Sequence, residues 1–252
     1  MNDKLNVTKY YNNPRWWGGD VGVPNRERIE RTLMMIPADV TTVLDLGCGD
    51  GQVSNHLISK GIKTLGVDIS FTALQFFQGG KVIASADNLP FEENSFDLVL
   101  SSEVLEHLPA HIYETSLQEI ERIAKKYILI STPYDEYLPT AYSSCENCQH
   151  IFHANLHVRS FNQEIHNTLF AKFKAMKSEK VSFWQHYHTL TTVRHFFGSY
   201  RLKNGAVCPQ CGKVQTGKQT HFRWLISKGF DFLSKILPKH HKGRWIISLY
   251  QA

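Results

Sequence analysis

The stretch Val43-Leu44-Asp45-Leu46-Gly47-Cys48-Gly49-Asp50-Gly51 decides the fold of this chain. Its first residues form an apolar run that predicts a buried strand, and three glycines follow directly. Because glycine has no β-carbon, a ligand can touch the backbone where the strand passes into its helix. The stretch therefore predicts a nucleotide-like ligand at a strand-to-helix turn.

The spacing of the glycines excludes two common kinds of nucleotide site. A dinucleotide fingerprint needs a glycine three residues after the second one, and that position is Gln52. A phosphate-gripping P-loop needs Gly-Lys-Ser or Gly-Lys-Thr, and the stretch has neither. We therefore do not expect NAD, FAD or a P-loop nucleotide.

Short apolar runs alternate with helix-like segments around this stretch, which is typical of a parallel sheet built from β-α units. Strands are predicted over 42–46, 64–69, 81–86, 96–101 and 127–131, and helices over 25–35, 51–59, 71–77 and 112–123. Farther on, the pattern predicts a helix over 161–170 and strands over 174–183 and 245–250. The fold class is therefore α/β.

Four carboxylates stand at or next to the carboxyl ends of these strands. Asp68 closes the second strand, 21 residues after Gly47, where an acid accepts hydrogen bonds from ribose hydroxyls. Asp87 closes the third strand, and Asp45 and Glu103 complete the set. Such an edge repels pyrophosphate and suits a ligand with cationic groups, such as S-adenosylmethionine.

Five motifs in order resemble the class I S-adenosylmethionine-dependent methyltransferases, especially their small-molecule, ubiquinone-biosynthesis-like type 11 group. The motifs lie at 43–51, 66–70, 86–91, 95–99 and 102–107, and the resemblance covers about residues 38–133. It implies a Rossmann-like sheet of seven strands with helices on both faces. It also implies S-adenosylmethionine as the cofactor.

The resemblance implies a role for the residues of these motifs. The first acid and the glycines would bound the methionine part, the acid of the second strand would hold the ribose, and residues 87–89 would frame the adenine. Taken singly, each acid could equally be a helix N-cap or a turn residue. The implied cofactor-binding set is Asp45, Gly47, Gly49, Gly51, Asp68, Ile69, Asp87, Asn88, Leu89, Ser102 and Glu103.

Methyl transfer from a sulfonium is an in-line displacement, so the protein must mainly position the nucleophile. If the acceptor is a hydroxyl, a nearby histidine can remove its proton at neutral pH. His107 is the first candidate, with a capping or packing role beside Pro109 as the equal alternative. Tyr134 and Asp135 after the fifth strand, and His153 farther on, are further catalytic candidates.

The residues after the fourth predicted strand bear on the acceptor. Enzymes that methylate exocyclic amines of nucleic-acid bases carry Asn/Asp-Pro-Pro-aromatic there, and this chain has Ser101-Ser102-Glu103-Val104. We therefore expect a small-molecule or glycan acceptor, with O-methylation favoured and nucleic acid disfavoured. An RNA-modifying enzyme and a cofactor-binding scaffold without catalysis remain the two alternatives.

Two Cys-x-x-Cys pairs, Cys145 with Cys148 and Cys208 with Cys211, predict a closed four-sulfur site. Zinc is the expected ion because it takes tetrahedral thiolate ligands without redox chemistry. His150 or His153 could replace one sulfur. A redox role is the competing interpretation, although a thioredoxin-type pair is single and opens a helix.

We divide the chain into an N-terminal helical lid over 1–37, a methyltransferase core over 38–183 and a C-terminal region over 184–252. Aromatic residues of the lid segment, among them Tyr11 and Trp17, could cover the cofactor or pack on the core. An amphipathic helix over 222–237 and a basic run over 239–244 end the chain before its last strand. Burial against the core or in a homodimer is favoured over contact with anionic lipid or a lipid-linked acceptor.

Composition is that of a globular protein, with 42% hydrophobic residues and a net charge of +5. The sequence shows no signal-peptide pattern and no run of about 18 apolar residues that could span a bilayer. Paired cysteines suit metal binding in a reducing compartment. We expect a cytoplasmic protein, with peripheral contact to the inner face of the membrane left open.

Overall fold

The computed structural model describes residues 7–19, 22–186, 193, 205–217, 229, 232 and 240–252. The chain divides into two compact units, which we treat separately. The sheet unit comprises Tyr11–Asp135, Phe161–Ser182 and Gly243–Ala252, and the cysteine unit comprises Met1–Tyr10, Glu136–Ser160 and Phe183–Lys242. The expected core over 38–183 included the first cysteine pair, whereas that pair falls in the cysteine unit.

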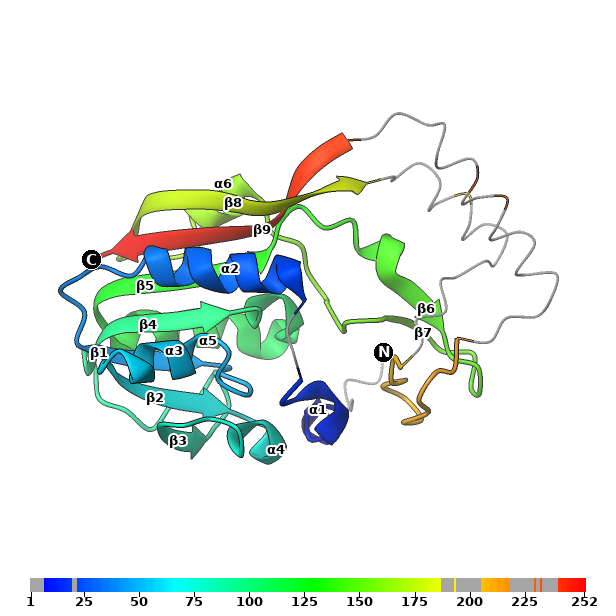
Figure 1. Cartoon of the computed structure of the whole chain (residues 1–252), viewed down its shortest axis with the longest axis horizontal. Helices are drawn as coiled ribbons and strands as arrows, with labels where there is room; N and C mark the ends of the chain where they lie inside the picture. The colour runs from blue at the N-terminus through cyan, green and yellow to red at the C-terminus, as the bar shows by residue number, and fades with distance from the viewer. Residues whose placement is uncertain are drawn as a thin grey trace. The chain divides into compact units, whose positions relative to one another are not determined.

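Seven strands form the sheet in the order β3-β2-β1-β4-β5-β9-β8 (Figure 1). Neighbouring strands from β1 to β5 run parallel, and the C-terminal strand β9 runs antiparallel to β5. The predicted seven-stranded α/β fold is confirmed. The strands are β1 (Thr42–Leu46), β2 (Lys63–Asp68), β3 (Gly80–Ile83), β4 (Phe96–Ser102), β5 (Ala124–Pro133), β8 (Lys174–His186) and β9 (His240–Gln251).

Helices cover both faces of the sheet, because alternate strand residues point to opposite sides. On one face, Leu44, Val99 and Ile128 pack with Ile120 of α5 (Ala110–Ile123). On the other, Val43, Leu98 and Leu129 pack with α2 (Val23–Met34) and α3 (Ser54–Ser59). Strands buried on both sides are continuously apolar, and this is why the sequence pattern located them.

Two predicted helices are shorter in the structure. The helix expected over 71–77 is α4 (Phe71–Leu74), which the Ser70 side chain caps by accepting from the Ala73 N–H. It ends early because Lys81 Nζ donates to the Leu74 and Phe77 carbonyls at 2.7 and 3.2 Å. The helix expected over 161–170 is α6 (Gln163–Asn167), capped by Asn162 and followed by Thr168, whose hydroxyl bonds the last carbonyls.

The third and last strands also differ from the prediction. The strand expected over 81–86 ends at Ile83, because residues 85–88 turn back with Asn88 N–H donating to the Ser85 carbonyl at 3.1 Å. The prediction that a basic run over 239–244 precedes the last strand is partly wrong, since residues 240–244 already belong to β9. The amphipathic helix over 222–237 lies outside the described residues except at Gly229 and Phe232, which are helical.

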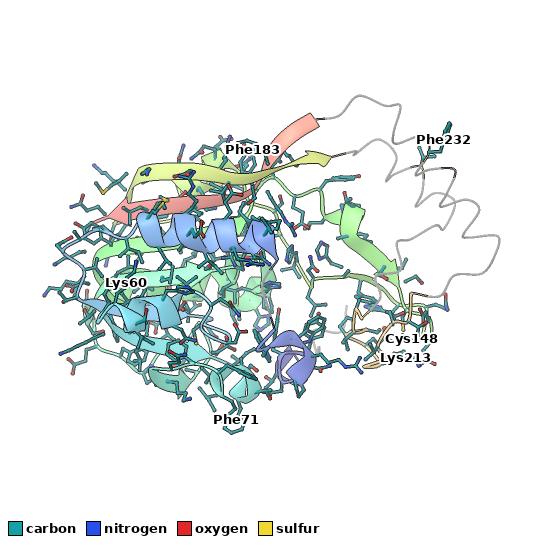
Figure 2. The ribbon with its side chains drawn as sticks, in the orientation of Figure 1. Lys60, Phe71, Cys148, Phe183, Lys213 and Phe232 are labelled. Atoms are coloured by element: carbon teal, nitrogen blue, oxygen red, sulfur yellow. The ribbon has the colours of Figure 1, made fainter. Side chains whose placement is uncertain are left out.

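The described residues of the cysteine unit contain two short strands. Strands β6 (Tyr142–Ser144) and β7 (Ile151–His153) pair antiparallel, preceded by the 3-10 turn η3 (Leu138–Ala141). The buried cluster among these described residues consists of Cys145, Phe152, Ala154, Ala206 and Cys208. Cys148 and Lys213, labelled in Figure 2, belong to this unit.

Short helices lie at the N-terminus, α1 (Val7–Tyr11) and the 3-10 turn η1 (Pro14–Trp16). A further 3-10 turn, η2 (Leu105–His107), follows β4. Among the described residues, no helix combines the length and apolar character needed to cross a membrane.

Candidate cofactor site and cysteine cluster

The glycine loop follows β1 at the carboxyl edge of the sheet. Its start is tied to β2, because the N–H groups of Gly47 and Cys48 donate to the Val67 carbonyl at 2.7 and 3.1 Å. Gly47 has a φ of +70°, and a β-carbon there would collide with Val104. Only glycine fits this position, because its backbone is left-handed and Val104 fills the space that a β-carbon would take.

Asp68, the last residue of β2, holds this loop in place. Its Oδ2 accepts the Gly49 N–H at 2.9 Å and its Oδ1 accepts the Ser70 N–H at 2.8 Å. Burial raises the pKa of this carboxyl, which is only 9% exposed. A carboxylate has about four acceptor positions, so Asp68 can accept a further hydrogen bond, such as that of a ribose hydroxyl, besides those from the backbone.

Asp45 lies one strand away and is more deeply buried. The Ser54 hydroxyl at the start of α3 donates to its Oδ2 at 2.6 Å. The pKa of Asp45 is raised to about 7, mainly by burial. The charge of neighbouring Asp68 adds to this rise, and the Ser54 hydrogen bond opposes it. This acid therefore titrates near neutral pH, beside the backbone of the glycine loop.

A buried arginine, Arg28 of α2, completes the edge and was missed by the sequence analysis. It is 8% exposed, and its Nη1 donates to the Ser102 hydroxyl at the end of β4. No acceptor for its Nε–H lies within the described part of the chain. The signal in the sequence was a cation beside Ile29 on the buried face of an amphipathic helix.

Glu103, just after β4, has a φ of +61°, which is unusual for a residue with a side chain. Its N–H donates to the Ser131 carbonyl at 2.9 Å, and its Oε2 accepts the Trp245 indole N–H at 2.6 Å. The Ser131 hydroxyl donates to Oε1 at 3.3 Å. Strands β5 and β9 therefore hold Glu103 at the edge in a backbone conformation it would seldom adopt alone.

The residues expected around the adenine form a turn after β3. The Ser85 hydroxyl donates to the Asp87 carboxylate. Leu89 is buried, and its N–H donates to Glu119 Oε2 of α5 at 2.9 Å. Asn88 is exposed, and Ile69 lies half-buried between β2 and α4. The structure thus places all the predicted cofactor residues in the sheet unit, either near the carboxyl ends of β1, β2 and β4 or on the loops after β1, β2, β3 and β4.

The N-terminal segment lies over the glycine loop. The Trp17 ring is so close that a β-carbon at Gly49 would stand 2.8 Å from it. The Gly18 N–H donates to Asp50 at 2.9 Å, and the Ser70 hydroxyl donates to the Tyr11 carbonyl at 2.8 Å. Trp17 therefore packs on the glycine loop, and a lid over a bound cofactor stays a prediction.

The catalytic candidates fall in different places. His107 of η2 is partly exposed, packs edge-on against Tyr11 at 5.9 Å, and has Nε2 3.8 Å from Glu106 Oε1. Tyr134 follows β5, where Lys180 Nζ lies 4.4 Å from its ring centre. Asp135 donates its N–H to the Phe161 carbonyl at 2.6 Å. His153 belongs to the cysteine unit.

His153 lies in a group with Glu136 and His157. The two imidazoles stack with their centres 4.6 Å apart, and the Glu136 carboxylate contacts both, 3.3 Å from His153 Nε2 and 2.5 Å from His157 Nδ1. Burial raises the pKa of Glu136, but hydrogen bonds from both histidines outweigh it and lower the pKa to about 2. His153 Nδ1 accepts backbone N–H groups, so its proton sits on Nε2 and disfavours a metal there.

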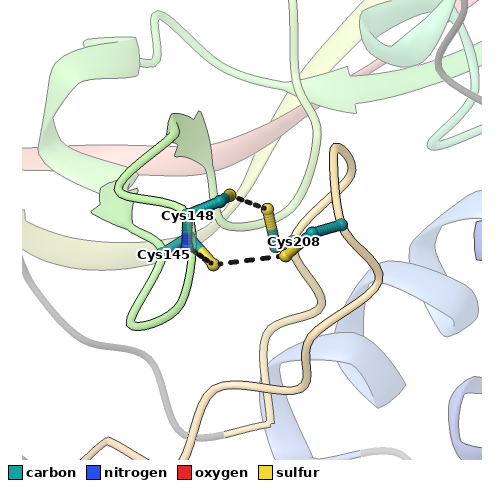
Figure 3. Close-up of side chains that lie close together, drawn as sticks. Cys145, Cys148 and Cys208 are labelled. Carbon is teal, nitrogen blue, oxygen red and sulfur yellow. Dashed lines mark hydrogen bonds between the residues drawn. The ribbon is translucent and has the colours of Figure 1, made fainter.

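The four paired cysteines form one cluster, with all four sulfurs within 4.8 Å of one another. Figure 3 shows its two cross-pair contacts, Cys145 Sγ to Cys211 Sγ at 3.6 Å and Cys148 Sγ to Cys208 Sγ at 3.7 Å. Sulfurs bound to zinc at ~2.3 Å stand about 3.8 Å apart at the corners of a tetrahedron. The cluster fits a tetrahedral metal ion, and neither His150 nor His153 is part of it.

Comparison with known proteins supports the interpretation of the sheet unit as a methyltransferase fold. Residues 44–128 match the family described as a methyltransferase domain. An uncharacterized protein of Methanocaldococcus jannaschii is 37% identical over 124 residues, which are 47% of this chain and 52% of that protein. A ubiquinone biosynthesis O-methyltransferase of Albidiferax ferrireducens is 30% identical over 111 residues, covering 38% of this chain and 44% of that enzyme.

The chain spans about half or less of the length of these curated relatives. Among solved structures, magnesium protoporphyrin IX methyltransferase of Synechocystis PCC 6803 with bound SAH resembles this chain with a TM-score of 0.57 and 17% identity. The match covers 71% of this chain and 94% of that one. At this identity the likeness shows the fold.

Proposed function

We propose that this chain, whose residues 44–128 match the methyltransferase domain family, is an enzyme that moves a methyl group from S-adenosylmethionine to a hydroxyl of a small-molecule or sugar acceptor. The observation that carries the proposal is the glycine loop bonded to Asp68 at the carboxyl edge of the sheet. It offers bare backbone and a carboxylate side by side, which suits a ribose linked to a cationic group.

The buried polar groups fit each end of the donor. Asp68 would hold the ribose hydroxyls, and residues 87–89 would border the adenine. Arg28 would bind the carboxylate of the methionine part, because it is a buried cation that interacts with Asp45 and its Nε–H has no acceptor among the described residues. Asp45, Ser102 and Glu103 would border the same part.

The bound cofactor supplies an electrophilic methyl group on a sulfonium sulfur. The chain's own residues then act by positioning the acceptor and removing its proton. His107 is our candidate for the base, because it follows β4 at the same edge and its imidazole is partly exposed. Tyr134, Asp135 and His153 remain the other candidates.

Binding of S-adenosylhomocysteine, measured by calorimetry, tests the donor site. Asp68→Ala removes a carboxylate that would accept ribose hydroxyls, and we expect the Kd to rise at least about 10-fold. Asp39→Ala is the matched control, because Asp39 pairs with Lys126 on the surface. An unchanged Kd for Asp68→Ala would refute the ribose role.

Arg28→Lys separates the carboxylate role from a structural one. Lysine keeps the charge but lacks the planar fork that fits a carboxylate, so S-adenosylhomocysteine should bind about 10-fold more weakly. 5′-Methylthioadenosine lacks the amino-acid part, and its affinity should not change. Equal losses for both ligands would assign Arg28 to the fold alone.

A screen for transfer of a radiolabelled methyl group tests the acceptor class, using hydroxylated small molecules, sugar nucleotides and RNA. Label on a hydroxyl compound supports the proposal, label on RNA supports the RNA-modifying alternative, and cofactor binding without transfer supports a scaffold. With the acceptor found, His107→Gln should slow kcat by about 10²–10⁴-fold without changing the S-adenosylhomocysteine Kd. Normal turnover would remove His107 as base.

We propose, secondly, that Cys145, Cys148, Cys208 and Cys211 bind a structural zinc ion. The sulfur separations near those of a tetrahedral thiolate site support this, and zinc prefers such a site. Elemental analysis of protein purified without chelator should find about one zinc per chain, lost in Cys145→Ser. Cys48→Ser, in the glycine loop and outside the cluster, should retain the metal.

A further inference from the structure

The two cysteine pairs are joined by more than their sulfurs. We call residues 145–148 the first knuckle and residues 208–211 the second knuckle. The Glu146 carboxylate of the first knuckle accepts the N–H groups of Thr216 and Gly217, both at 3.0 Å, just beyond the second knuckle. These contacts hold the two knuckles together independently of any thiolate.

Gln215 reaches from the second knuckle region into the first. Its side chain is buried, with the residue 1% exposed, and its Oε1 accepts the Glu146 N–H at 2.8 Å. Its Nε2 donates to Cys145 Sγ at 3.4 Å and to the Lys213 carbonyl at 3.1 Å. One amide therefore touches the first knuckle twice and its own loop once.

The orientation of this amide follows from its partners. The Glu146 N–H can only donate, so the amide oxygen must face it. The amide nitrogen must then face the sulfur and the Lys213 carbonyl, which both accept. A rotated amide would leave a buried N–H without an acceptor and turn an oxygen toward a thiolate, so one orientation is strongly favoured.

Cys145 consequently receives more donors than its own knuckle can supply. The N–H groups of Asn147 and Cys148 donate to its sulfur at 3.4 and 3.5 Å, and Gln215 adds a third donor from the other knuckle. In the reverse direction, Asn147 Nδ2 lies 3.8 Å from Cys211 Sγ, but at an exposed position. Water can replace the exposed donor, whereas nothing replaces the buried one.

We propose that Gln215 is a positioning residue of the metal centre, which sets the register of the two knuckles and stabilises the thiolate of Cys145 toward the ion. The proposal rests on the zinc site proposed above. Residues that orient metal ligands through a hydrogen bond typically contribute 10–100-fold to metal affinity. Gln215 meets this description although it lies outside both Cys-x-x-Cys motifs.

Zinc affinity of the full chain, measured by competition with a chromophoric chelator under reducing conditions, tests the proposal. Gln215→Glu keeps the shape and the acceptor but replaces the N–H donor with an anion, and Gln215→Leu removes both contacts without adding charge. Both should raise the zinc Kd by about 10–100-fold. Gln210→Glu, at an exposed position within the second knuckle, and Asn147→Ala should change it less than about threefold.

Cobalt substitution adds a readout that loosened packing alone would not move. An N–H donor stabilises sulfur electrons, so its loss in Gln215→Leu should shift the thiolate-to-cobalt charge-transfer band to lower energy. S-Adenosylhomocysteine affinity should be unchanged, which reports that the sheet unit of the variants is folded.

The outcomes separate the two claims. A wild-type chain that binds no zinc overturns both the zinc site and the role of Gln215. Normal zinc binding by the wild type together with unchanged affinity and an unshifted cobalt band in both Gln215 variants overturns the role of Gln215 alone. If Gln215→Glu proves insoluble, the neutral Gln215→Leu decides.

Discussion

The sheet unit and the cysteine unit are stabilised in different ways. The sheet unit buries continuous apolar strands between helices, in one large cluster on each face of the sheet. Among its described residues, the cysteine unit has one buried cluster, formed by Cys145, Phe152, Ala154, Ala206 and Cys208, and two of these five are candidate metal ligands. Hydrophobic burial stabilises the sheet unit, whereas in the described part of the cysteine unit the candidate metal ligands are themselves part of the buried cluster.

The glycine-loop site and the cysteine cluster also differ in how far apart in sequence their residues lie. The glycine loop and Asp68 are close in sequence, so building that site requires few residues to be brought together. The cross-pair sulfur contacts join positions 60 and 66 residues apart. Closing such loops costs conformational entropy, which a metal ion bound by four thiolates can offset.

The largest expected effect is loss of the metal ion, which should unfold the cysteine unit and leave the sheet unit folded. Cys208→Ser removes a fully buried ligand, and zinc binding in small thiolate sites is worth about 10–16 kcal/mol. We expect loss of zinc and rapid proteolysis within residues 136–160 and 205–217, with the thermal transition of the sheet unit retained. Limited proteolysis followed by mass spectrometry checks this, and a collapse of both units would show that their stabilities are not separable.

A large-to-small substitution in the sheet should destabilise the sheet unit and leave zinc binding by the cysteine unit unchanged. Leu100 of β4 is fully buried among α2 and α3 side chains, so Leu100→Ala should cost about 2–5 kcal/mol of unfolding free energy. Zinc content should not change. Denaturant unfolding with parallel zinc analysis tests both statements, and zinc loss would contradict the comparison.

Acid should destabilise the sheet unit through His166. This side chain is fully buried between Thr132 Oγ1 at 2.9 Å and Ser248 Oγ at 2.8 Å, and burial lowers its pKa to about 4. The unfolded chain, with a histidine pKa near ~6.5, binds the proton more readily, so stability falls as pH drops below that value.

The contribution of His166 to this loss should be about 2 kcal/mol between neutral pH and about pH 5. Burial raises the pKa of Asp45 to about 7, so this acid acts in the opposite direction over the same range. The prediction therefore concerns the difference between the wild type and His166→Gln, which carries no titrating imidazole and should be less destabilised by acid. Urea unfolding at a series of pH values measures it. Parallel profiles for the two proteins would mean that other groups cause the acid sensitivity.

The smallest expected effect concerns a helix cap. The Ser70 side chain accepts the Ala73 N–H at 3.1 Å at the start of α4 and donates to the Tyr11 carbonyl. Ser70→Ala should cost about 1 kcal/mol of unfolding free energy in the sheet unit. Thr72→Ser, which keeps a hydroxyl at the neighbouring position, is the control, and an equal cost in both variants would assign the loss to packing.

The helix boundaries show where sequence reasoning stopped short. The helix predicted from Gly51 begins only at Ser54, because the backbone at Gly51 is left-handed, with a φ of +82°. The helix predicted to reach Phe77 stops at Leu74, because Lys81 satisfies the carbonyls at its end. Apolar spacing predicts that a helix exists, but its ends depend on individual hydrogen bonds.

The sequence by itself determined the α/β fold, the glycine loop and the pairing of cysteines, because each is written in a contiguous pattern whose chemistry needs little else. Only the tertiary structure decided which distant groups complete the sites. Arg28 meets Ser102 across 74 residues, Trp245 meets Glu103 across 142, and Gln215 meets Cys145 across 70. Apart from the place of Arg28 on the buried face of its helix, no local pattern marks these partners, since their roles depend on burial next to one particular atom, and burial is a property of the folded chain.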